Sequence, residues 1–142
     1  MDKSFKLSFL DVFLPFELAE KGVLVGSRAQ GVSKTQYADW DYMFLEEYKE
    51  EILNTLRNKK ISFSINELNG SIKFFVTLAE TTYLINFIFI DKQETYNAWI
   101  KATEVLKIVG NAFTTKQGRI KAFCDLVVYF GGEPSKYPNF CS

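Results

Sequence analysis

One sequence feature limits the possible folds of this chain more than any other. It is a short apolar run that ends in Gly-Ser and is followed by a pair of aspartates. Residues 23–25 form the apolar run, and Gly26 and Ser27 end it. Asp39 and Asp41 then open a second apolar run. Because strand side chains alternate between faces, the two aspartates point the same way, roughly 6.5–7 Å apart along a strand. Carboxylates on one face repel each other unless a cation lies between them, so the pair predicts a divalent-cation site.

Length and composition describe an ordinary globular chain. We expect the 142 residues to form a single domain, 1–142, which buries about 68–70% of its unfolded surface. Equal numbers of acidic and basic residues give zero formal charge, which argues against broad electrostatic affinity for nucleic acid or anionic membranes. The sequence contains no histidine, which excludes Ser-His-Asp and Cys-His triads and removes the commonest zinc ligand.

The predicted compartment is the cytoplasm. The chain shows no signal peptide, and its two cysteines, Cys124 and Cys141, are expected to be reduced thiols. No apolar run approaches the length of about 18 residues that a membrane helix needs, so no membrane partner is expected.

Apolar periodicity predicts an α/β (α+β) fold with a single mixed sheet of about five strands flanked by helices. Alternating or continuous apolar runs predict strands at 23–26, 39–46, 61–67, 72–78 and 83–90. Residues 28–37 are expected to be a loop. Helical spacing predicts helices within 5–20 (ending or kinked at Pro15), over 46–60, over 92–109, and from an N-cap at Thr115 to about residue 130.

The Gly-Ser pair and the aspartates together suggest a phosphate-and-metal site. A glycine lets the backbone approach a phosphate closely, and nearby amide and hydroxyl groups can bind its oxygens. Mg²⁺ is held in proteins by a few carboxylates together with substrate phosphates. The alternative is a hairpin-like turn with an aspartate pair on the surface.

This arrangement resembles the nucleotidyltransferase superfamily, which includes DNA polymerase beta, the aminoglycoside nucleotidyltransferases and the minimal nucleotidyltransferases. The family pattern is an apolar residue, Gly-Ser, a short loop, Ser-Asp-x-Asp and an apolar run. The matching residues here are Val25-Gly26-Ser27-Arg28-Ala29-Gln30-Gly31 and Ala38-Asp39-Trp40-Asp41-Tyr42, with alanine in place of the usual serine. The resemblance implies that Gly26 and Ser27 hold a nucleoside triphosphate, and that Asp39 and Asp41 coordinate Mg²⁺ or Mn²⁺.

The family also has a third carboxylate on a later strand, and this chain has Asn86 there. An asparagine can offer a metal one neutral carbonyl oxygen, but it cannot act as a base. Asn86 is therefore either the third member of a catalytic group or a polar residue that ties down a sheet edge. Whether the chain is an enzyme is left open by this residue.

Three basic residues are candidates for phosphate contact. Arg28 lies inside the loop, and Lys116 and Arg119 share a face at the start of the last helix. Some small nucleotidyltransferase-like proteins carry basic residues on such a helix that reach the triphosphate. The alternative for Lys116 and Arg119 is an ordinary solvated helix face.

Two functions follow from the resemblance. In the first, the chain transfers a nucleoside monophosphate from a nucleoside triphosphate to an unidentified acceptor, which could be a protein, an RNA or a small molecule. In the second, it is a catalytically impaired binding or regulatory protein that senses a nucleotide or inhibits a partner protein. Small members of this fold in phage genomes and toxin–antitoxin pairs make the second credible. A purely structural role would leave the aspartate pair unexplained.

Overall fold

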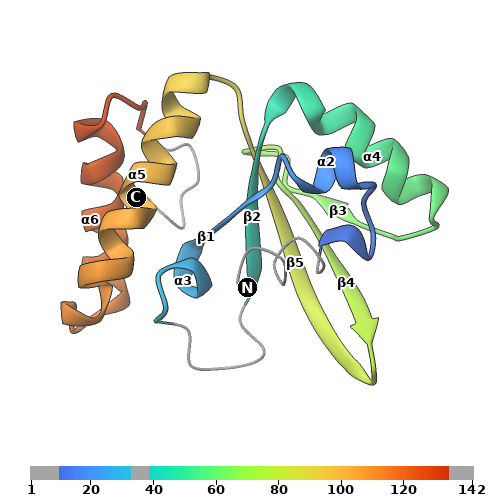
Figure 1. Cartoon of the computed structure of the whole chain (residues 1–142), viewed down its shortest axis with the longest axis horizontal. Coiled ribbons are helices and arrows are strands. Elements are labelled where there is room, and N and C mark those ends of the chain that lie inside the picture. Colours follow the sequence, from blue (N-terminus) through green and yellow to red (C-terminus); the bar gives the residue numbers. More distant parts are fainter. Residues whose placement is uncertain (1–9, 33–38, 135–142) are drawn as a thin grey trace.

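The computed structural model describes residues 10–32 and 39–134 and has a five-stranded mixed sheet with helices on both faces (Figure 1). This confirms the predicted fold class. The strands are β1 (Val23–Val25), β2 (Trp40–Leu45), β3 (Ser64–Ile65), β4 (Ile72–Leu78) and β5 (Thr81–Ile90). The α-helices that lie wholly within the described residues are α2 (Phe16–Ala19), α3 (Gly26–Ala29), α4 (Lys49–Asn58), α5 (Gln93–Val109) and α6 (Lys116–Tyr129). Two 3₁₀ turns, Glu46–Tyr48 and Gly110–Ala112, precede α4 and follow α5.

The sheet order is β1-β2-β5-β4-β3. Only the β2–β5 pair is parallel; the other three pairs are antiparallel. β5 lies in the middle, and its last six residues are all buried, as its continuous apolar run predicts. β4 and β5 form a hairpin that extends past the helices at the lower right of the view (Figure 1).

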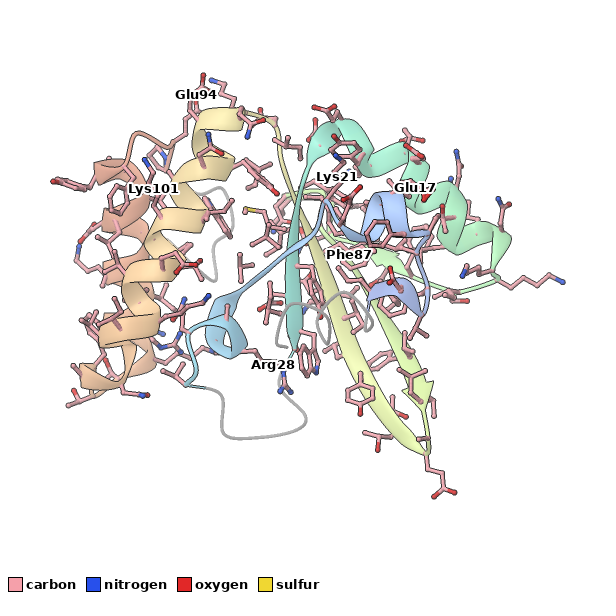
Figure 2. The ribbon with its side chains drawn as sticks, viewed as in Figure 1. Glu17, Lys21, Arg28, Phe87, Glu94 and Lys101 are labelled. Carbon is pink, nitrogen blue, oxygen red and sulfur yellow. The ribbon has the colours of Figure 1, made fainter. Side chains whose placement is uncertain are left out.

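Each face of the sheet has its own core, because side chains alternate along every strand. Tyr42, Phe74 and Phe87 lie on the face covered by α2 and α4, where Phe87 contacts several other aromatic rings (Figure 2). Met43 and Ile88 lie on the other face, which α5 and α6 cover. Position 41 on β2 and position 86 on β5 have the parity of this second face.

The structure shortens or divides several predicted elements. The strand predicted at 61–67 is reduced to Ser64–Ile65. After its C-terminal end the side chain of Asn66 accepts hydrogen bonds from the backbone N–H groups of Leu68 and Asn69 and starts a turn. Pro15 is the N-cap of α2, so the break in the first helical region falls where proline predicted it. Part of the loop predicted at 28–37 belongs to α3, and residues 33–38 lie outside the described part. Thr115 caps α6 as predicted.

Two further findings bear on the predicted compartment. Within the ranges 10–32 and 39–134, no helix has the length and hydropathy needed to cross a membrane. Cys124 on α6 is disulfide-bonded, so the prediction of a reduced thiol is wrong for this residue, and Cys141 lies outside the described residues. Disulfides are typical of oxidising compartments, so this bond does not support a cytoplasmic location. The cytoplasmic location stays a prediction.

Candidate functional site

Four strands place one residue each in a row across the sheet. Val25 on β1 is opposite Asp41 on β2, Asp41 is opposite Asn86 on β5, and Asn86 is opposite Lys73 on β4. Three of these four residues carry polar side chains, on the face that α5 and α6 cover elsewhere. The strand register therefore brings Asp41, Asn86 and Lys73 together.

Gly26 fits the close approach between α3 and the Asp41 carboxylate. Its φ of +76° lies in the left-handed region that side chains other than glycine's rarely adopt. A Cβ at this position would lie 2.5 Å from Oδ2 of Asp41. Glycine at position 26 thus allows the start of α3 to lie against the carboxylate.

The amide of Asn86 is bonded to Asp41 on one side only. Its Nδ2 donates a hydrogen bond of 3.0 Å to Oδ1 of Asp41. Its Oδ1 is buried and accepts no hydrogen bond from any described residue, and the residue as a whole is 7% exposed. A buried acceptor without a donor costs roughly 1–3 kcal/mol. A buried acceptor of this kind calls for an explanation, and a cation is one that fits its chemistry.

Burial raises the pKa of Asp41 to about 6. The hydrogen bond from Asn86 acts in the opposite direction, and the nearby charge of Asp39 raises the pKa further. The positive charges of Lys73 and Arg28 lower it. Asp41 therefore exchanges a proton close to neutral pH, and a bound cation would compete with that proton.

Asp39 lies just before β2 and pairs with a lysine. Nζ of Lys73 is 3.6 Å from Oδ2 of Asp39, and the two side chains are 49% and 34% exposed. An exposed pair of this kind contributes little to stability, roughly 0–1 kcal/mol, so it is readily exchanged. Lys73 thus contacts Asp39, while on the strand it is opposite Asn86, which is hydrogen-bonded to Asp41.

Arg28 is stacked on Trp40 at the start of β2. Its Cζ lies 4.2 Å from the centroid of the Trp40 ring, and Figure 2 shows the arginine beside this end of the strand. Burial lowers the pKa of Arg28, while the charges of Asp41 and Asp39 act to raise it. The guanidinium is therefore close enough to both aspartates to interact with them.

The other predicted phosphate contacts lie elsewhere or show no contact with the aspartates. Ser27 follows Gly26 in α3 and is half-buried. Nη1 of Arg119 donates to Oε1 of Gln30 at 2.8 Å, which ties α6 to the end of α3. Lys116 is exposed at the first position of α6. A role of Lys116 and Arg119 in phosphate binding remains a prediction.

The residues present fit a hard divalent cation held jointly with phosphate. Asp41, Asp39 and the orphaned Oδ1 of Asn86 supply only oxygen donors, which Mg²⁺ prefers. In the part of the chain that the structure describes, no cluster of three or more Asp, Glu, Cys or His could hold a metal. The remaining ligands of a cation held by these residues would be water or substrate oxygens.

Sequence reasoning missed Lys73 as a member of the site. Its position in an apolar strand is visible in the sequence, but the β4–β5 register that places it opposite Asn86 is not. The one signal was its parity, because Lys73 alternates with the buried residues Ile72 and Phe74 and so shares the face of Asp41.

In comparisons with known proteins, no family model, curated protein or solved structure matches this chain.

Proposed function

We propose that this chain is a nucleotidyltransferase-like protein that binds a nucleoside triphosphate with Mg²⁺ or Mn²⁺ and transfers a nucleoside monophosphate to an acceptor. The observation that carries the proposal is the contact of Asp41 with both Gly26 and Asn86. These residues come from the three segments whose order in the sequence resembles the superfamily. The predicted cytoplasmic location belongs to the same proposal.

The roles of the side chains follow from their positions. Asp39 and Asp41 would hold the cation, with the carbonyl oxygen of Asn86 as a neutral third donor. When bound, the cation neutralises charge on the phosphates and on the leaving pyrophosphate. Gly26 lets the start of α3 lie against Asp41, and Arg28 would place a positive charge near the phosphates. Asn86 cannot accept the proton of an attacking hydroxyl, so that proton would pass to another group.

A second candidate is a nucleotide-binding or regulatory protein without turnover. The observation that favours it is Asn86 itself, which donates a hydrogen bond to Asp41 where a third carboxylate would add negative charge. Such a protein would bind nucleotide through the same residues and act on a partner protein.

A transfer assay tests the first candidate and separates it from the second. The protein is incubated with each labelled nucleoside triphosphate, Mg²⁺ or Mn²⁺, and cell extract as the source of acceptors. Asp39→Ala and Asp41→Ala should abolish label transfer, while Asp125→Ala, an exposed carboxylate on α6, should leave it intact. Calorimetric nucleotide binding without transfer would support the second candidate. Neither transfer nor binding by the wild-type protein would refute both.

A further inference from the structure

The strand register places Lys73 next to the residues that are proposed to bind the metal and the nucleotide. Lys73 is opposite Asn86, and Asn86 is hydrogen-bonded to Asp41. Lys73 also shares a face with these two residues, because its neighbours Ile72 and Phe74 are buried in the opposite core. No other described lysine forms an ion pair with Asp39.

The charges of the site balance without a metal. Asp39 and Asp41 carry two negative charges when ionised, and Lys73 and Arg28 carry two positive charges. A divalent cation that uses Oδ2 of Asp39 as a ligand would displace the ammonium group of Lys73, which lies 3.6 Å from that oxygen. The long separation of 3.6 Å and the half-exposed side chains make that displacement inexpensive.

We propose that Lys73 is a built-in cation that holds Asp39 in the metal-free protein and binds triphosphate oxygens when a divalent metal takes Asp39. The assignment rests on the proposed function and adds a phosphate-binding residue that the sequence did not indicate. The Oδ1 of Asn86 is a separate observation that favours a nearby cation, because it is a buried acceptor without a donor among the described residues. Lys73 thereby couples the two ligands: it competes with the metal alone and assists the triphosphate.

Opposite shifts in two affinities test the assignment. Mn²⁺ binding alone is measured by the loss of the free-ion resonance signal, and binding of inorganic tripolyphosphate in excess Mn²⁺ is measured by calorimetry. Lys73→Met should tighten Mn²⁺ binding by about two- to five-fold, because it removes a competing ion pair. The same variant should weaken tripolyphosphate binding by about tenfold or more, because it removes a charge-assisted hydrogen bond. Lys73→Arg keeps the charge and should show neither shift.

Lys92 provides a matched control. It is also an ion-paired lysine, with Glu133, and its side chain is 52% exposed against 49% for Lys73. It lies beyond the end of β5, away from the row formed by Asp41, Asn86 and Lys73, so Lys92→Met should change neither affinity. If the wild-type protein binds both ligands, any pattern in Lys73→Met other than opposite shifts overturns the assignment. If the wild-type protein binds neither ligand, the proposed function fails and the assignment fails with it.

Discussion

Replacing Gly26 with alanine tests the close approach of α3 to Asp41, and Gly31 supplies an internal control. The two glycines have almost the same left-handed backbone, with φ of +76° at Gly26 and +73° at Gly31. Their surroundings differ, because a Cβ on Gly26 would lie 2.5 Å from Oδ2 of Asp41, while a Cβ on Gly31 would meet no atom of the described residues within 4 Å. The pair therefore separates backbone strain from the contact with the carboxylate.

The two costs can be estimated separately. An L-residue in the left-handed region costs roughly 1–2 kcal/mol, so we expect Gly31→Ala to lower the free energy of unfolding by about that amount. Gly26→Ala adds overpacking against a partly buried carboxylate, which typically costs about 1–3 kcal/mol. The expected total for Gly26→Ala is about 2–5 kcal/mol.

Urea unfolding followed by circular dichroism measures both variants, alone and combined with Asp41→Ala. Removing the carboxylate should abolish the excess cost of Gly26→Ala and leave a loss close to that of Gly31→Ala. Equal losses for the two glycine variants in the wild-type background would refute the contact. An excess that persists after Asp41→Ala would show that α3 is constrained by something other than this carboxylate.

Three further predictions concern the charges of the site. Asp41 has a pKa of about 6 in the folded protein and 3.8 in the unfolded chain, so the folded protein binds more protons between these pH values. Its stability therefore falls as the pH rises through this range, by up to about 3 kcal/mol. Asp41→Asn should lack this fall when unfolding is measured at pH 4.5 and 7, and an identical pH profile would contradict the assignment. Asn86→Asp should tighten Mn²⁺ binding and increase any transfer activity, whereas unchanged Mn²⁺ affinity would exclude position 86 as a ligand. Arg28→Ala should lower the free energy of unfolding by about 0.5–1 kcal/mol, because it removes the cation–π contact with Trp40. In a Trp99→Phe background it should also shift the fluorescence emission of Trp40, and an unchanged spectrum would contradict the stacking.

The fold class was predictable from local patterns, because strong apolar periodicity identifies helices and strands without knowledge of the tertiary contacts. The apolar run of β5, the amphipathic pattern of α4 and the threonine cap of α6 each identified an element. The strand predicted at 61–67 was much too long, and after its end Asn66 turns the chain by accepting hydrogen bonds from the backbone N–H groups of Leu68 and Asn69. Apolar alternation alone cannot show that competition.

The site was predictable only in part. Gly26, Asp39 and Asp41 were found because they lie close together in the sequence, and Asn86 because of the family resemblance. Lys73 could not be found, because its role depends on how β4 pairs with β5 across the hairpin. Register is set by the packing of the whole sheet, which a motif of neighbouring residues does not contain.

Asn86 and Lys73 are best understood together. A third carboxylate at position 86 would place another negative charge next to Asp41, whose pKa burial already raises to about 6. Like charges disfavour ionisation, so that acid would keep Asp41 protonated at neutral pH unless a metal were bound. Asparagine instead donates a hydrogen bond to Asp41, and Lys73 pairs with Asp39. Asn86 and Lys73 both stabilise the metal-free site, and under the proposed function both should weaken its affinity for a bare cation. A protein built in this way should take up its cation together with a polyphosphate, which supplies the missing negative charge.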